Sequence, residues 1–198
     1  LALDQLKETL PNIKWVAPVV AWFADSLNIE KAKVAPRVEY KDKVVTYPHL
    51  WRVGNFKRKD TKLVNHKDKR PIYGGTPSDR SVLNLLDDLK RRGYSIMFYP
   101  MLLVDLMDKP WRGHLRGNSN AIPDFFNNSE GYNQFILHYA RMVKDKVDAF
   151  IIGSEFRDLT AIKTANNKFP AVEELMKLAK EVKAIVGDKV KVTYAADW

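Results

Sequence analysis

Four acidic residues stand where apolar, strand-like runs of the sequence end: Asp25, Asp105, Glu155 and Asp197. In a parallel sheet or barrel the carboxyl ends of the strands meet at one edge, so these acids would converge. Two carboxylates that face each other across a cleft can cleave a glycosidic bond, one as the acid and the other as the nucleophile or base. An acid at a strand end can also simply cap the following loop, and we prefer that interpretation for Asp25.

Glu155 is the first of these acids to consider. It follows residues 147–154, an almost wholly apolar run between two helical patterns, which is typical of a parallel strand buried on both faces. A carboxylate at the mouth of an apolar barrel is suited to general acid or base catalysis. The alternative is that Glu155 pairs with Arg112 or Arg157 and only braces a loop. Aromatic residues that could stack on sugar rings occur near the same predicted strand ends, namely Trp22, Tyr99, Trp111, Tyr194 and Trp198.

The elements that must position these residues alternate along the chain. Strands are predicted at residues 13–23, 95–104, 147–154 and 190–198, with helices before the last three of them. In the first of these helices Thr76 is the expected N-cap, and in the last, which begins at Pro170, Val172 and Met176 are expected to be buried. A long loop is predicted at residues 106–128. This alternation predicts right-handed parallel units, as in half of a TIM barrel or in a doubly wound sheet.

Residues 26–75 interrupt the alternation. Val, Tyr and Lys alternate roughly over residues 34–47, which predicts a half-exposed antiparallel strand or hairpin. We interpret residues 26–75 as a β-rich insertion within one domain that spans residues 1–198. Residues 31–70 hold thirteen Lys or Arg against four acids, an excess that equals the net charge of +9 of the chain. A solvated lysine-rich loop is preferred over a nucleic-acid site, because no recognisable nucleic-acid module accompanies it.

Composition excludes several other kinds of site. The chain has no cysteine, which excludes disulfides and thiolate metal sites, and its four histidines show no metal-ligand spacing. No metal and no cofactor are therefore predicted. No apolar run approaches the length of a membrane span, and the first residues do not resemble a secretory signal. Because the chain opens without methionine and stops directly after a strand-like run, we expect it to be a piece of a larger protein.

Six short motifs resemble those of one protein family in their order and spacing. They are YGGTPSD at residues 73–79, FYP at 98–100, PWRG at 110–113, GSEFR at 153–157 with Leu159 and Thr160, FPAV at 169–172, and YAADW at 194–198. Together they resemble the glycoside-hydrolase-like TIM-barrel domain of the large tail or baseplate protein of alphaproteobacterial gene transfer agents and related phages. The resemblance runs from about residue 10 to the end.

The resemblance implies a fold and a chemistry. The fold is a (β/α)8 TIM barrel, of which this chain supplies the N-terminal half with about four parallel strands. The chemistry is that of retaining glycosidases, with Glu155 as the acid/base and the nucleophile on a later strand, beyond Trp198. Ser154 stands where many such enzymes have an asparagine, a departure that bears on recognition of the sugar 2-hydroxyl.

The same resemblance implies a substrate and partners. The substrate would be a bacterial cell-envelope glycan, contacted by Asp105, Trp111, Arg112, Arg157, Tyr194, Asp197 and Trp198. Other tail or baseplate subunits are the expected partners, in a phage-like particle assembled in the bacterial cytoplasm. The open edges of a half barrel also allow self-association. The alternative is a non-catalytic glycan-binding or structural tail module, because a fold does not fix a function.

Overall fold

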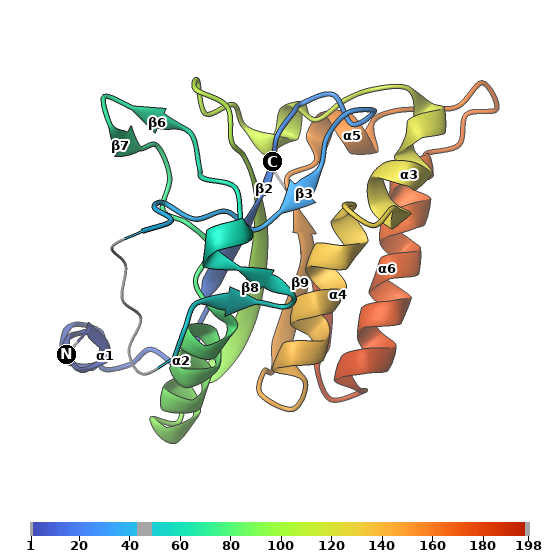
Figure 1. Cartoon of the computed structure of the whole chain (residues 1–198). Coiled ribbons are helices and arrows are strands. Elements are labelled where there is room, and N and C mark those ends of the chain that lie inside the picture. Colours follow the sequence, from blue (N-terminus) through green and yellow to red (C-terminus); the bar gives the residue numbers. More distant parts are fainter. Residues whose placement is uncertain (1, 43–48, 197–198) are drawn as a thin grey trace.

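The computed structural model describes residues 2–42 and 49–196, so the predicted substrate contacts Asp197 and Trp198 lie outside the described residues. Four parallel strands stand in sequential order in the central sheet: β2 (Val19–Ala24), β8 (Ser95–Val104), β9 (Ala149–Ser154) and β10 (Lys191–Ala195) (Figure 1). The two-residue strand β3 (Val34–Ala35) runs antiparallel along the outer side of β2. The predicted α/β fold with half of a barrel is confirmed, and the sheet does not close among the described residues.

Three longer helices connect these strands: α2 (Asp79–Arg91), α4 (Tyr132–Val143) and α6 (Pro170–Val186). Figure 1 shows α4 and α6 side by side, in front of β9. The shorter helices are α1 (Ala2–Thr9), α3 (Ile122–Asn127) and α5 (Arg157–Thr160), and the 3-10 turns are η1 (Arg58–Asp60), η2 (Arg112–His114) and η3 (Ser119–Ala121). The predicted loop at 106–128 therefore contains two 3-10 turns and α3. No helix in the described part of the chain has the length and hydropathy that crossing a membrane requires.

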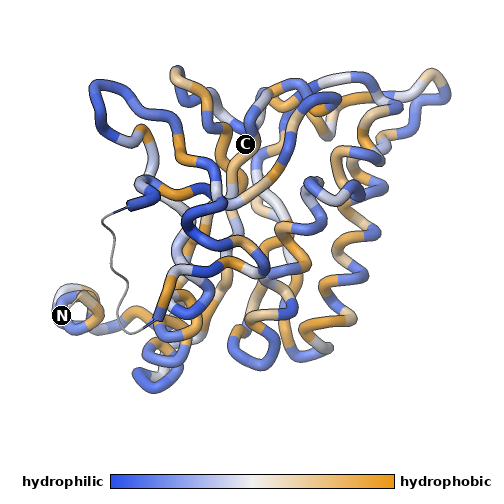
Figure 2. The backbone as a smooth tube through the Cα atoms, viewed as in Figure 1, coloured by the Kyte–Doolittle hydropathy of each residue, from blue (hydrophilic) through white to orange (hydrophobic). Residues whose placement is uncertain are grey.

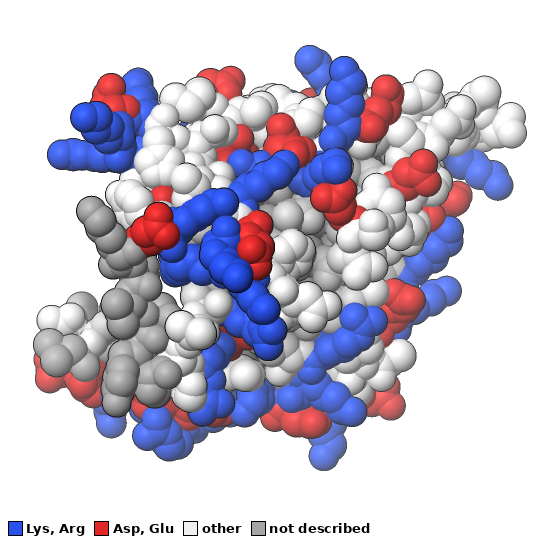
Figure 3. Space-filling model, in the orientation of Figure 1, with Lys and Arg blue, Asp and Glu red and all other residues white. Residues whose placement is uncertain are grey.

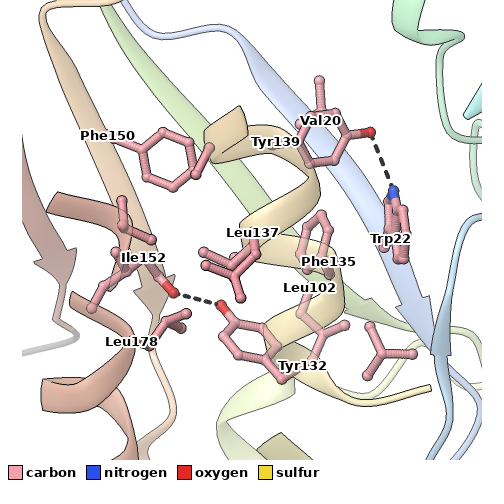
Figure 4. Close-up of a cluster of buried hydrophobic side chains, with 14 of the residues drawn as sticks. Val20, Trp22, Leu102, Tyr132, Phe135, Leu137, Tyr139, Phe150, Ile152 and Leu178 are labelled. Atoms are coloured by element: carbon pink, nitrogen blue, oxygen red, sulfur yellow. Dashed lines mark hydrogen bonds between the residues drawn. The ribbon is translucent and has the colours of Figure 1, made fainter. Parts of the chain in front are cut away.

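The core lies between the sheet and the helices. Alternate residues of β8 are buried, among them Ile96, Phe98 and Leu102, as expected for a strand with one face on the core. Figure 4 shows Tyr132 and Tyr139 of α4 reaching the strands, where Tyr132 donates a hydrogen bond to the carbonyl of Ile152 (2.9 Å). Burial raises the pKa of both tyrosines. Figure 2 shows that the hydrophilic stretches, in contrast to this apolar core, are concentrated in the outer loops.

Two prolines shape the sheet. Pro18 lies between β1 (Trp15–Val16) and β2, which pair with β8 in one continuous register. The N–H of Tyr99 donates to the carbonyl of Pro18, so the neighbouring position, Pro100, would direct its absent N–H toward β9. The pairing of β8 with β9 is limited to Met97 and Phe98, before that position. Pro100 thus accounts for the end of this ladder.

Two helix details differ from the sequence prediction. The N-cap of α2 is Ser78, whose hydroxyl accepts from the N–H of Ser81, whereas Thr76 is buried and bonds elsewhere. In α6 the buried stripe includes Leu175 and Leu178, while Val172 and Met176 are exposed. Helical periodicity identifies an apolar stripe but not which side chains at its border are covered by neighbours.

The segment between β2 and α2 covers the outer edge of β2. It contains two antiparallel hairpins, β4 (Arg52–Val53) with β5 (Phe56–Lys57) and β6 (His66–Lys67) with β7 (Arg70–Pro71). The strand predicted over residues 34–47 is replaced, in its described part, by the short β3; residues 43–47 lie outside the described residues. On the face drawn in Figure 3, Lys and Arg side chains form a band over the middle of the molecule, with Asp and Glu side chains beside it.

Candidate functional site

The carboxyl end of β9 contains a β-bulge. Ile151 pairs with Thr193 and Ser154 with Ala195, so Ile152 and Gly153 together face one residue of β10, Tyr194. The extra residue places Ser154 on the same face of the sheet as Ile151, whereas plain alternation would place them on opposite faces. A Cβ atom at Gly153 would lie 3.1 Å from the Tyr132 hydroxyl and 3.2 Å from the Tyr194 ring, so any larger residue there would require one of these two side chains to shift.

Glu155 follows the bulge in a left-handed backbone conformation, with φ of 54°. Such a conformation costs a non-glycine residue about 1–2 kcal/mol. Two hydrogen bonds to β10 hold the turn: Glu155 N–H donates to the carbonyl of Ala195 (2.9 Å), and Phe156 N–H donates to the hydroxyl of Tyr194 (2.7 Å). Strained residues held in this way cluster at functional sites, which makes Glu155 a candidate on geometry alone.

The carboxylate of Glu155 is bound through one of its oxygens. Oε2 accepts from the indole N–H of Trp111 at 2.6 Å and forms an ion pair with a guanidinium nitrogen of Arg112 at 2.8 Å. The side chain of Glu155 is 34% exposed, whereas that of Arg112 is 9% exposed. Of the two arginines considered as partners, Arg112 is therefore the one that contacts Glu155, and the carboxylate keeps a solvent-facing part.

Arg112 is fixed from its other side by the bulge. Its Nε donates to the carbonyl (3.1 Å) and the hydroxyl (3.0 Å) of Ser154, which is almost fully buried. Ser154, which departs from the asparagine of many glycosidases, therefore has a definite role here as an acceptor for Arg112. This contact could not be read from the sequence, because 42 residues separate the two side chains.

Trp111 contacts Arg157 and His114, which in turn contact Asp158. The guanidinium of Arg157 lies 5.0 Å from the Trp111 ring centre, and the His114 ring contacts the same indole edge to face at 5.4 Å. Arg157 also donates to Asp158 (2.9 Å), and this bond, followed by a contact with His114, lowers the pKa of Asp158. His114 and Asp158 were not singled out from the sequence, although both lie within three residues of predicted site residues.

Tyr194 and Asp105, which were also predicted as site residues, lie in different surroundings. Tyr194 belongs to the turn at Glu155, where its hydroxyl and ring support Phe156 and Gly153. Asp105 is instead 1% exposed, forms an ion pair with Arg37, and accepts from the N–H of Asn65 at 3.0 Å. It is enclosed by the segment that follows β2.

Two further expectations concern Asp25 and Trp22. Asp25 accepts from the N–H of Lys33 (2.8 Å), which is the loop-capping role preferred for it. Trp22 was expected near the strand ends, but it is buried in the core, where its indole N–H donates to the Tyr139 hydroxyl (Figure 4). In the described part of the chain, no group of three or more His, Cys, Asp or Glu side chains is arranged to hold a metal ion.

Three solved structures with a similar fold are GH113 mannanases. A GH113 beta-1,4-mannanase matches with a TM-score of 0.56 and 14% identity, over 98% of this chain and 48% of the mannanase chain. A complex structure of a GH113 beta-1,4-mannanase matches with a TM-score of 0.58 and 16% identity, over 98% and 48% of the two chains. The GH113 beta-mannanase AaManA from Alicyclobacillus acidocaldarius, in complex with ManMIm, gives a TM-score of 0.53 and 13% identity, over 98% and 47%. This chain thus spans about half the length of the structures it matches, and at these identities the likeness establishes the fold alone.

Sequence comparisons locate the resemblance within the chain. No curated protein matches the sequence. A family model does match, and it covers the second and third helices of the α/β alternation together with β9, the turn at Glu155 and β10. Residues 130–198 match the GTA TIM-barrel-like domain, which confirms, over that part of the chain, the resemblance drawn from the sequence motifs.

Proposed function

We propose that this chain supplies the acid/base half of a retaining glycoside hydrolase that acts on a bacterial cell-envelope glycan. The observation that carries the proposal is Glu155, a partly exposed carboxylate in a strained turn at the carboxyl end of a parallel strand. The glycoside-hydrolase-like fold and the family match at residues 130–198 support it.

In this proposal Glu155 protonates the glycosidic oxygen as the bond to the anomeric carbon breaks. A second carboxylate attacks the anomeric carbon, and Glu155 then activates the water that releases the sugar. The second carboxylate would come from the remainder of a complete barrel, at about 5–5.5 Å from that of Glu155. Arg157, whose side chain is 53% exposed, is the proposed sugar contact among the described residues.

The setting that we propose is the tail or baseplate of a phage-like particle, where other tail subunits are the partners. The family name of the match supports this setting. The free side of β10 is the proposed place for the further strands of the barrel, or for a second chain. The exposed Val172 and Met176 on the neighbouring α6 support this, because a further helix or chain would cover them.

The test is release of reducing sugar from isolated cell-envelope glycans by the full-length protein and its Glu155→Gln variant. We expect the substitution to lower the rate about 10²–10⁴-fold, the usual contribution of a general acid. Glu130→Gln is the matched control, because Glu130 is an exposed glutamate that pairs only with Lys33 among the described residues. A rate that Glu155→Gln leaves unchanged would overturn the assignment.

A second function is favoured by one observation, the ion pair between Glu155 and Arg112. A carboxylate that only braces a loop would show the same pair, and the barrel would then serve as a glycan-binding module of a tail. Glycan binding that survives Glu155→Gln, together with no turnover by either protein, would establish this function instead.

A further inference from the structure

Trp111 and Arg112 approach the same oxygen atom of Glu155, Oε2. The two residues are adjacent in the chain, where Trp111 is the N-cap of η2 and Arg112 is its first residue. Oε2 accepts from the indole N–H and lies 2.8 Å from a positively charged guanidinium nitrogen, so a proton placed on it would face both groups. Among the described residues, Oε1 is thus the carboxyl oxygen on which a proton meets neither group.

We propose that Trp111 and Arg112 fix Oε2 of Glu155, with Arg112 itself held by Ser154, and thereby assign proton transfer to Oε1. This inference rests on the proposed glycosidase function and assigns new roles to the two residues. They are positioning residues that act on the acid, in place of the sugar contacts that the sequence motifs implied. Ser154 acts one step further away, by holding Nε of Arg112 through its hydroxyl and its carbonyl.

Each proton transfer then involves one defined oxygen atom of Glu155. The proton on Oε1 passes to the glycosidic oxygen as the bond to the anomeric carbon breaks, and the sugar leaves as an alcohol. The negative charge that remains on Glu155 faces Arg112 through Oε2, so the guanidinium stabilises the product form of the acid. In the second half of the reaction a water molecule gives a proton to Oε1 as its oxygen bonds to the anomeric carbon, and the bond between that carbon and the second carboxylate breaks.

The first experiment measures the contact on this chain without a substrate, through the indole N–H signals in a proton–nitrogen NMR spectrum. Glu155→Gln and Ser154→Ala are expected to shift the Trp111 signal. The signals of Trp51, which donates to the carbonyl of Thr76 (2.8 Å), and of Trp22 are internal controls and should stay in place. A Trp111 signal that does not move in Glu155→Gln would overturn the inference.

The second experiment uses the full-length protein with phenyl and 2,4-dinitrophenyl glycosides of the sugar that the reducing-sugar assay identifies. Trp111→Phe and Arg112→Met should lower kcat about 10-fold or more for the phenyl glycoside. The dinitrophenyl glycoside, whose leaving group needs no proton, should be affected far less in forming the glycosyl-enzyme. Arg112→Lys should recover part of the loss. An equal loss on both glycosides would indicate a merely structural role and would overturn the inference.

The two experiments separate this inference from the function on which it rests. A shifted Trp111 signal with no turnover of any envelope glycan removes the glycosidase and, with it, the assignment of proton transfer, while the contact at Oε2 stands. Turnover that depends on Glu155 but not on Trp111 or Arg112 keeps the glycosidase and removes the positioning roles.

Discussion

Asp105 and Glu155 follow neighbouring parallel strands, and each forms an ion pair with an arginine, yet their surroundings differ. The side chain of Asp105 is 0% exposed, and its carboxylate receives Arg37 and the N–H of Asn65. The side chain of Glu155 is 34% exposed, and its hydrogen bond from Trp111 and its ion pair with Arg112 share one oxygen. Strand-end position and an arginine partner are thus common to both acids, while enclosure and free acceptor capacity separate them.

The difference has a physical origin in the segment that follows β2. Arg37 donates to the carbonyl of Leu63 as well as to Asp105, and its backbone N–H donates to the hydroxyl of Thr76. Thr76 in turn donates to the carbonyl of Ala21 in β2 (2.7 Å). Asp105 therefore belongs to a polar cluster that attaches the segment to the sheet, whereas the described residues leave the Glu155 side chain 34% exposed. The comparison teaches that an acid at a strand end is available for chemistry only where the loops leave it accessible.

The largest expected effect comes from Asp105→Asn. The substitution leaves the buried guanidinium of Arg37 without a compensating charge, and breaking a buried pair in this way costs about 3–5 kcal/mol. The free energy of unfolding, measured with urea, should fall by this amount. Asp25→Asn is the control, since Asp25 is partly exposed and caps a loop, and its cost should stay below about 1 kcal/mol. Equal costs at the two positions would contradict the enclosure of Asp105.

Thr76→Val tests the next contact of the same cluster. Valine keeps the shape of the side chain but removes both the donor to Ala21 and the acceptor for the N–H of Arg37. Leaving buried backbone groups unpaired should lower the free energy of unfolding by about 1–3 kcal/mol. Thr164→Val, at a partly exposed turn, should change it by no more than about 0.5 kcal/mol. A neutral Thr76→Val would show that water replaces the hydroxyl and that the cluster is open.

Local sequence patterns predicted the features that depend on residues close together in the chain, namely the strands, the helices and their order. The strand ending at Ser154 and the four-strand order follow from apolar runs and helical periodicity, and these predictions were confirmed. The contacts that determine whether each acid is enclosed or accessible join residues that are distant in the chain. Arg37 is 68 residues from Asp105, and Trp111 is 44 residues from Glu155. No spacing rule encodes such pairs. The burial of Trp22 was missed for the same reason, because its partner on α4 is 117 residues away.

Glu174 provides a reference carboxylate away from the strand ends, with an expected effect of about 1 kcal/mol. Burial alone would raise its pKa, but hydrogen bonds from Lys177 (2.6 Å) and Asn127 (2.9 Å) outweigh burial, and its pKa is lowered. A lowered pKa stabilises the fold above the ordinary value of 4.5, and this stabilisation is lost as the pH falls through the lower value of the folded state. Unfolding measured from pH 6 down to pH 3 should show this loss, and Glu174→Gln should reduce it. An unchanged pH profile in Glu174→Gln would assign the acid sensitivity to other carboxylates.

Glu155→Gln should have the smallest effect on stability and so completes the comparison with Asp105→Asn. The amide oxygen can still accept from Trp111, and Arg112 keeps both contacts of its Nε with Ser154. The guanidinium loses the charge that it faces, but the Glu155 side chain is 34% exposed, against 0% for Asp105, so water can solvate the charge that Arg112 retains. The loss in the free energy of unfolding should stay below about 1 kcal/mol, the range of partly exposed ion pairs. The same chemical change, a carboxylate replaced by its amide, then separates the two acids by several-fold in stability. A cost at Glu155 as large as that at Asp105 would mean that the ion pair with Arg112 holds the barrel end together. A small cost, combined with lost turnover in the full-length protein, would mean that the charge of Glu155 serves chemistry rather than folding.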